Sequence, residues 1–318
     1  MVRPNPTQIA RFAAWLPQLD SVNAFDFCAG GGGELFPAAG APGALESFFL
    51  NAAHQFGFWY ARDHHYDRPM IATVGGVDRK GSDYLFYCFQ RALNTAPTFF
   101  EPEHLAQLSD AELDQMFWDD EGRNPLPMWQ EHLAITRAYA QWFLAENETP
   151  TSLVAACNQA EQPLATFLDR VGAIPGYAED PLKKKLMLLA VILENRPEQF
   201  LRVTDSASAV PIIDYHLQRS ALRTGLVEVT DAKVRADLAQ RRMVSDEVEG
   251  QIRNATYTAI DELVQQSGLS VAAIDYFFFT NRTRCPEMTE PQCAACPVEP
   301  VCAQRRSLFQ PVFRTTAY

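Results

Sequence analysis

The chain has 318 residues, 47% of them apolar, and a formal net charge of −12. This length and composition predict a large buried core, in one big domain or two closely packed ones. The acidic balance argues against an indiscriminate nucleic-acid binder, because phosphate contacts require clustered lysine and arginine. The longest apolar run, residues 186–193, is too short to cross a bilayer, so we expect a cytoplasmic protein without membrane contact.

Apolar residues recur at helical spacing along most of the chain. The expected helices are residues 44–60, 83–93, 103–118, 128–145, 152–171, 183–194, 231–242, 245–266 and 271–279. Strand patterns are few, and the best are residues 70–74 and 227–229. Residues 30–33 are all glycine, lack a flanking strand and predict a flexible turn. The pattern as a whole predicts an all-α fold.

Lys183, Lys184 and Lys185 form a basic triplet in the acidic part of the chain. One of these lysines could face a phosphate group. Runs of like charge are usually hydrated, however, so we expect a solvated helix face.

Asp214 directly follows the apolar run 210–213 and precedes a further expected helix. An aspartate in this position is partly desolvated and has the amides of a helix N-terminus nearby. Such a carboxylate can be ionised and still be poised for chemistry. The simpler interpretation is an ordinary helix N-cap.

Four cysteines lie close together near the C-terminus with the spacing C-x7-C-x2-C-x5-C: Cys285, Cys293, Cys296 and Cys302. Thiolates at this spacing are typical of structural zinc or of an iron–sulfur cluster. Disulfides are the alternative in exported proteins, but the first residues contain no apolar stretch suited to a signal peptide. The other cysteines stand in apolar surroundings and are expected in the core: Cys28, Cys88 and Cys157.

The pattern Asp214-x-His216-x2-Arg219-x3-Arg223-x-Gly225-Leu226 precedes the four-cysteine loop by about 70 residues. Together they resemble the helix-hairpin-helix superfamily of DNA glycosylases, of the endonuclease III and adenine glycosylase type. The resemblance covers roughly the C-terminal third, including residues 273–285, which look like the helix that leads into the first cluster cysteine of that family.

This resemblance implies a two-lobed helical DNA-glycosylase-like fold with a C-terminal [4Fe-4S] cluster loop. The four cysteines would hold the cluster, and DNA would be the partner. We expect residues 1–280 to form the helical domain, in one body or in two lobes with the active-site cleft between them. Residues 281–318 would form the iron–sulfur loop and tail.

Three features depart from the pattern of that superfamily. The first cysteine spacing is x7, where the family usually has x6. The glycine-rich hairpin that donates backbone amides to a DNA phosphate is replaced by residues 195–203. Lyase-competent members carry a lysine in that hairpin, and Arg196 stands near its place, so no Schiff-base lysine is evident.

A second, weaker resemblance runs through more of the chain. Residues 55–59, 90–93, 214–217 and 249–253 are similar, in order and spacing, to the queuosine salvage protein family. Those proteins are helical N-glycosidases that release queuine from a nucleotide. They lack the four-cysteine loop, and this chain has His216 where their D-Y-R motif has arginine. Both resemblances point to the same aspartate, Asp214.

The two resemblances imply an N-glycosidase in which Asp214 stabilises an oxocarbenium-like sugar and activates water. Without a lysine nucleophile, we expect a monofunctional DNA glycosylase that releases a modified, bulky base. Such a base must lie in a pocket between aromatic faces. The residues expected to contact the substrate are Phe58, Trp59, Tyr215, His216 and Arg219.

Two alternatives stay open. One is a queuosine-type nucleotide or nucleoside N-glycosidase, whose partner would be a modified nucleotide and whose product would be a base such as queuine. The other is a non-catalytic module in which the four cysteines hold a structural zinc ion, with Asp214 as no more than a cap. In each case we expect a monomer.

Overall fold

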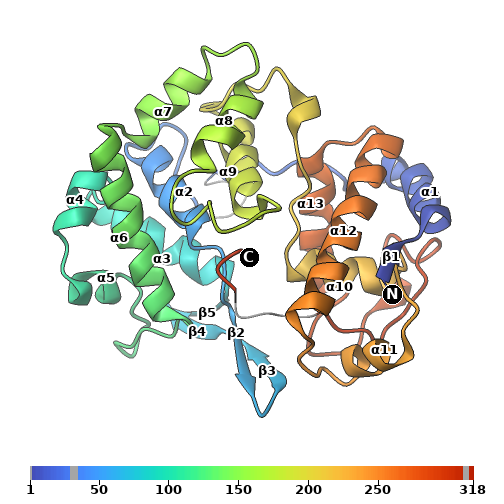
Figure 1. Cartoon of the computed structure of the whole chain (residues 1–318). Coiled ribbons are helices and arrows are strands. Elements are labelled where there is room, and N and C mark those ends of the chain that lie inside the picture. Colours follow the sequence, from blue (N-terminus) through green and yellow to red (C-terminus); the bar gives the residue numbers. More distant parts are fainter. Residues whose placement is uncertain (1, 29–34, 311–314) are drawn as a thin grey trace. The chain divides into compact units, whose positions relative to one another are not determined.

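The structure, a computed structural model, describes residues 2–28, 35–310 and 315–318, so the four-glycine run lies outside the described residues. These residues are mostly helical, as predicted, and their strands form short two-stranded pairs (Figure 1). None of the helices in the described part has the combined length and apolar character of a membrane span.

The chain divides into two compact units, each assembled from separate stretches of sequence. Unit 1 comprises Met1–Phe25, Ala61–Arg68 and Val210–Arg314, and unit 2 comprises Asp26–Tyr60, Pro69–Ala209 and Thr315–Tyr318. The four cysteines and Asp214 therefore both belong to unit 1. Where the chain passes from one unit to the other, β2 (Trp59–Arg62) pairs with β3 (His65–Pro69).

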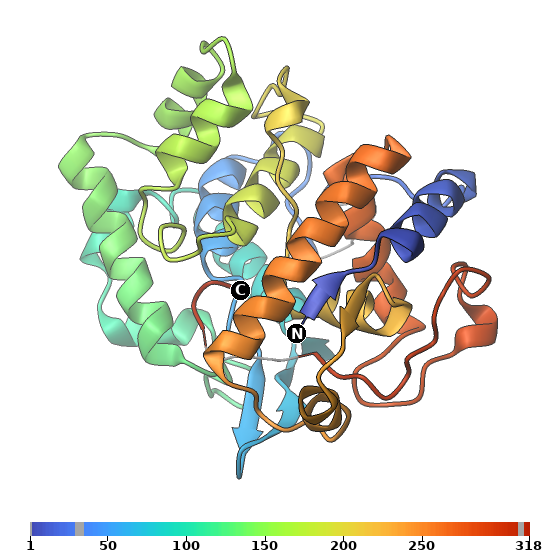
Figure 2. The same ribbon diagram turned by 45° about the vertical axis from the view of Figure 1, so that its right-hand side comes forward.

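Unit 1 is arranged around its longest helix, α12. Strand β1 pairs antiparallel with β6, which joins the start of the chain to the segment that follows α10. Helix α12 packs against α1, α10 and β1, and Figure 2 shows the blue α1 beside the orange α12. The elements are β1 (Val2–Pro4), α1 (Pro6–Trp15), η1 (Leu16–Gln18), α10 (Tyr215–Thr224), β6 (Val227–Val229), α11 (Ala232–Ala239), α12 (Asp246–Ser267), α13 (Val271–Thr280), η4 (Asn281–Thr283) and η5 (Cys293–Ala295).

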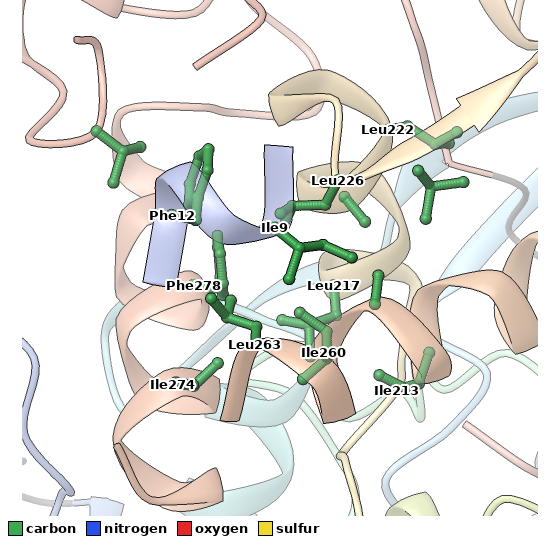
Figure 3. Packing of buried hydrophobic residues seen from close by; sticks show 14 of the residues in the cluster. Ile9, Phe12, Ile213, Leu217, Leu222, Leu226, Ile260, Leu263, Ile274 and Phe278 are labelled. Carbon is green, nitrogen blue, oxygen red and sulfur yellow. The ribbon is translucent and has the colours of Figure 1, made fainter. Parts of the chain in front are cut away.

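The core of unit 1 is formed by apolar side chains from these helices (Figure 3). Each large apolar side chain that is fully buried contributes about 1.5–3 kcal/mol. Helix α10 supplies Leu217, Ala221 and Leu222 to this core, which fixes the helix that follows Asp214. Besides Leu217 and Leu222, Figure 3 labels the core residues Ile9, Phe12, Ile213, Leu226, Ile260, Leu263, Ile274 and Phe278.

Unit 2 is a group of helices with one small hairpin. Phe49 of α2 packs edge-on against Phe143 of α6 and Phe167 of α8, with ring centroids 6.4 and 6.0 Å apart. Such aromatic contacts dominate the energetics of a core. The elements are α2 (Ala44–Ala53), β4 (Ile71–Val74), β5 (Val77–Lys80), α3 (Ser82–Thr95), α4 (Pro102–Gln107), α5 (Asp110–Met116), α6 (Trp129–Glu146), α7 (Pro150–Cys157), α8 (Pro163–Val171), α9 (Lys184–Asn195) and η3 (Ser206–Ser208).

Three predicted helices are shorter or divided, each for a local reason. The helix expected over 44–60 ends at Ala53, and Gly57 then turns the chain with a φ of 73° before β2. The helix expected over 103–118 is two helices, because Ser109 forms a capping box with Glu112 and starts α5. The helix expected over 152–171 is also two helices, and Pro163 begins the second at the position where proline is favoured.

The solvated face expected for the lysine triplet is wrong for two of its residues. Lys184 is 5% exposed and Lys185 is 0% exposed. Their Nζ atoms donate to the carbonyl oxygens of Gln55, at 3.0 Å, and Ala53, at 3.1 Å. These carbonyls lie at the C-terminal end of α2, where ammonium groups satisfy unpaired acceptors and the helix dipole favours positive charge.

A buried histidine pair lies beside these lysines. Nδ1 of His54 is 2.7 Å from Nδ1 of His132, and Nε2 of His54 is 3.0 Å from the hydroxyl of Thr136. Burial and, to a smaller extent, the charge of Lys185 together lower the pKa of His54 to about 3. Burial also holds the pKa of His132 well below its usual range, and electrostatic interactions with His54 and Lys185 act in the same direction. Both imidazoles are therefore neutral in the folded protein at neutral pH.

This pair predicts a loss of stability in mild acid. His54 has a pKa of about 3 in the folded protein and about 6.5 in the unfolded chain, so below pH 6.5 the unfolded chain binds a proton that the folded protein does not bind. By pH 5 this difference lowers the free energy of unfolding by about 2 kcal/mol. Chemical unfolding between pH 7 and pH 5 measures the slope. His132→Phe should flatten that slope while lowering stability at pH 7, because it removes the second buried imidazole of the pair. An unchanged slope in His132→Phe would contradict the assignment.

Candidate functional site

Asp214 is the N-cap of α10. Its backbone is extended, with φ −112° and ψ −174°, and its Oδ1 accepts the N–H of Leu217 at 2.9 Å. The residue before it, Ile213, is fully buried, and its carbonyl accepts from Nε of Arg253 at 3.2 Å. The carboxylate is thus half-buried and held in one orientation, which satisfies an N–H group that the first helical turn would leave unpaired.

One face of α10 is polar although it is buried. His216, Arg219 and Arg223 follow one another at spacings of three and four, which places them on one side of the helix. We call these three residues the α10 polar face. Their exposed fractions are 6%, 0% and 5%, so charged groups there need partners from another segment.

Glu287 supplies one of those partners. Its Oε1 lies 3.2 Å from Nδ1 of His216 and 3.2 Å from Nη1 of Arg219, and the two side chains of α10 are 3.1 Å apart at the same atoms. Glu287 itself is 4% exposed. A buried carboxylate and a buried guanidinium stabilise each other only as a pair, so removal of either leaves an uncompensated charge.

The aromatic neighbours of Asp214 are neutral at physiological pH. Burial lowers the pKa of His216 to about 4, although the charges of Asp214 and Glu287 act in the opposite direction. Burial raises the pKa of Tyr215 well above its usual range, and the charges of Asp214 and Glu287 raise it further. A neutral imidazole and a neutral phenol can donate or accept hydrogen bonds next to a carboxylate without adding charge.

The four cysteines are reduced and partly exposed. All four line one cavity of about 30 Å³, together with side chains of α10 and of the segment after α13. Three N–H donors point at their sulfur atoms: Nη1 of Arg223 lies 3.5 Å from Cys285, Nδ2 of Asn281 lies 3.4 Å from Cys296, and the backbone N of Gln304 lies 3.3 Å from Cys302.

These donors fit thiolate ligands, since hydrogen bonds to sulfur are typical of metal-bound cysteine. Burial, with a smaller contribution from the three neighbouring cysteines, raises the pKa of Cys302 to about 11, although the backbone N–H of Gln304 acts in the opposite direction. A bound cation would lower this pKa and favour the thiolate form. Among the described residues, however, no three Cys, His, Asp or Glu side chains are close enough together to surround a single ion. The ligand set therefore stays a prediction.

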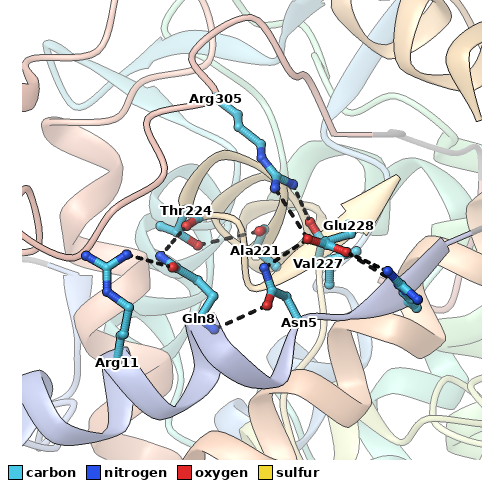
Figure 4. A network of polar contacts seen from close by, with 9 residues as sticks. Asn5, Gln8, Arg11, Ala221, Thr224, Val227, Glu228 and Arg305 are labelled. Atoms are coloured by element: carbon cyan, nitrogen blue, oxygen red, sulfur yellow. Dashed lines mark hydrogen bonds and ion pairs between the residues drawn. The ribbon is translucent and has the colours of Figure 1, made fainter. Parts of the chain in front are cut away.

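The cysteine segment, residues 285–302, is attached to α1, and the residues that follow it are attached to the C-terminal end of α10. Backbone N–H groups of Ala303 and Arg305 donate to the carbonyls of Thr224, at 3.0 Å, and Arg223, at 2.9 Å. Figure 4 shows Gln8 of α1 bound to the same Thr224 carbonyl, at 2.8 Å, and Arg305 beside β6. Trp15 of α1 donates to the carbonyl of Pro297 at 2.9 Å, and Arg11 donates to that of Pro300 at 3.2 Å.

Gly225 makes this attachment possible. It ends α10 with a φ of 84°, and a Cβ at this position would lie 2.7 Å from the Cβ of Ala303. A side chain would be strained by the backbone and would push the chain after Cys302 away from α10.

The two predicted aromatic contacts lie in unit 2. Phe58 is 5% exposed, and its ring packs against Gly81, where an added Cβ would come within 3.3 Å of the ring. Trp59 is 7% exposed. The structure brings Tyr215, His216 and Arg219 together with Asp214 on α10, whereas a substrate contact by Phe58 or Trp59 stays a prediction. Glu287 could not be predicted from the sequence, because a single glutamate in a loop belongs to no pattern.

Comparison of the chain with protein-family models and with curated protein sequences gives no match.

The cysteine set predicts a specific metal content. Protein purified without oxygen should be brown and contain about four irons per chain if the cysteines hold a [4Fe-4S] cluster. Cys296→Ser should lose the colour and the iron. Cys88→Ser is the matched control, because Cys88 is fully buried in α3 of unit 2. A colourless protein with one zinc per chain would contradict the cluster, and a metal-free protein would contradict both assignments.

Proposed function

We propose that the chain is a monofunctional N-glycosidase that hydrolyses the N-glycosidic bond of a modified base in DNA. Asp214 is the proposed catalytic carboxylate. The four cysteines are proposed to hold a [4Fe-4S] cluster that stabilises the fold of the C-terminal segment. The activity of this proposal comes from the resemblance to the helix-hairpin-helix glycosylases, and the geometry of unit 1 supports it.

The observation that carries the proposal is the position of α10. Its first residue follows Asp214, and its last turn carries the attachment of the cysteine segment. The aspartate thus stands at the start of α10, and the chain that follows the last cysteine is attached at the end of the same helix.

The chemistry requires a carboxylate that is fixed but reachable. Asp214 uses Oδ1 for the N–H of Leu217, which leaves Oδ2 for water or for the sugar. As the bond from C1′ to the base nitrogen breaks, its electron pair leaves with the base, and the carboxylate stabilises the positive charge on the sugar. Water then adds to C1′ and gives its proton to the carboxylate, which releases it to the solvent, while the departed base takes one proton from the solvent.

The residue that stands where lyase-competent enzymes have their lysine supports a hydrolytic enzyme that does not cleave the strand. Arg196 stands there, and its guanidinium is buried. It pairs with Glu198 at 2.7 Å and donates to the carbonyl of Pro37 at 3.2 Å. An arginine that is charged and bonded in this way does not act as an amine nucleophile.

The net charge favours a second candidate substrate. A formal charge of −12 opposes the approach of a long polyanion, and the glycine-rich hairpin of the resembling DNA enzymes is replaced here. A modified nucleotide carries far less charge than a duplex. A nucleotide N-glycosidase of the queuosine salvage type would use the same Asp214 and the same reaction.

Asp214→Asn separates catalysis from capping. Asparagine is as good an N-cap as aspartate, so α10 should persist and the melting temperature should change little. The loss of the carboxylate should lower kcat by about 100-fold or more. Asp231→Asn is the matched control, because Asp231 caps α11 in the same unit and accepts from Val234 at 2.9 Å. Full activity in Asp214→Asn would overturn the catalytic assignment.

The substrate class follows from a direct comparison. We expect release of free base, detected by mass spectrometry, from DNA that carries 7-deazaguanine-type or glycosylated pyrimidine bases. The DNA should retain an abasic sugar and an intact strand. Release from the matching mononucleotides, with none from DNA, would replace the first candidate with the second. No release from either would contradict the N-glycosidase assignment.

A further inference from the structure

The stretch between the first two cysteines contains a glutamate whose side chain contacts helix α10. Glu287 stands two positions after Cys285, in the x7 segment that is one residue longer than the pattern of the resembling enzymes. Its side chain turns away from the thiol-lined cavity, whose lining residues do not include it, and reaches the α10 polar face. Glu290, in the same segment, is exposed.

Contacts hold both the backbone and the side chain of Glu287 in place. Its backbone carbonyl accepts from Nη2 of Arg241 at 2.7 Å, and Oε1 contacts His216 and Arg219. The adjacent Pro286 carbonyl accepts from Nη1 of Arg223 at 2.7 Å, and the same nitrogen contacts Sγ of Cys285. Arg223 therefore links the first thiol to the backbone that positions Glu287.

Because Arg219 and Glu287 are both buried, the loss of their contact would leave a charge without a partner inside the protein. Nε and Nη2 of Arg219 are buried without hydrogen-bond partners, so Nη1 carries the polar contacts that the structure gives this guanidinium. If Glu287 withdrew, a full positive charge would stay buried in the middle of α10. The helix would then have to shift or open to hydrate that charge, and the start of α10 carries Asp214.

We propose that Glu287 is a positioning residue, through which occupation of the four-cysteine site orders α10 around Asp214. The inference rests on the proposed function only for the role of Asp214, because the coupling between loop and helix exists whatever reaction the chain performs. A metal bound by the thiols would hold the backbone of residues 285–293 in one conformation. This backbone positions Glu287, and the carboxylate of Glu287 in turn holds the side chains of His216 and Arg219. Loss of the metal frees the carboxylate and loosens the helix.

Hydrogen exchange of the full-length chain tests this coupling without an activity assay. In the metal-loaded protein, Glu287→Gln should raise the exchange rate of the amides of α10 by about tenfold, since a buried charge loses its partner. Glu290→Gln should exchange like the unaltered protein. Metal content and visible absorbance should be unchanged in both variants, because neither residue is a thiol ligand.

Removal of the metal by a chelator completes the test. In the unaltered protein it should raise exchange in α10 by the same factor, and in Glu287→Gln it should add little, because the two changes act through one contact. Chelation of the unaltered protein also serves if the variant does not fold. Unchanged exchange in α10 after either change would overturn the proposal.

The outcome is independent of the glycosidase assignment. If the chain releases no base and yet α10 responds to Glu287→Gln and to chelation, the proposed function fails and the coupling stands. If base release is observed, Glu287→Gln should lower kcat and leave metal content intact, and Glu287→Asp should restore part of the rate. A fall in rate without any change in exchange would contradict the positioning role.

Discussion

The fold of unit 1 depends on one constraint, which is that the charged side chains on the buried face of α10 need partners. The opposite face of that helix supplies Leu217 and Leu222 to the core, so the helix cannot rotate its charges into water. The partners come from residues 285–308, which bond to Arg219 and Arg223 from a distant part of the sequence. A buried arginine without such partners would oppose folding.

This constraint connects the two features that the sequence makes visible. The N-terminal end of α10 orients a carboxylate, and its C-terminal end, with Gly225, accepts the backbone that follows the last cysteine. A metal held by the thiols would add free energy to contacts that the chain already makes. In our proposal the cysteine segment is a brace with an effect on the aspartate, and the proposed chemistry belongs to the carboxylate alone.

Local signals predicted part of this arrangement and long-range contacts did not. Helices α12 and α13 lie close to the ranges expected from apolar spacing, with Ser245 and Ser270 as their N-caps, and the N-cap position of Asp214 follows from the helix after it. The contact of Glu287 with His216 joins residues far apart in the chain, and no periodicity encodes it. The buried lysines of α9 were misjudged for the same reason, since their acceptors lie at the end of α2.

The most direct test of the central claim is hydrolysis in water labelled with heavy oxygen. Asp214 is proposed to direct water at C1′, so the label should appear in the sugar of the product, while the released base carries none and the phosphodiester strand stays intact. Label in the base would show attack on the heterocycle, and a broken strand would show lyase chemistry. Either result would contradict the account.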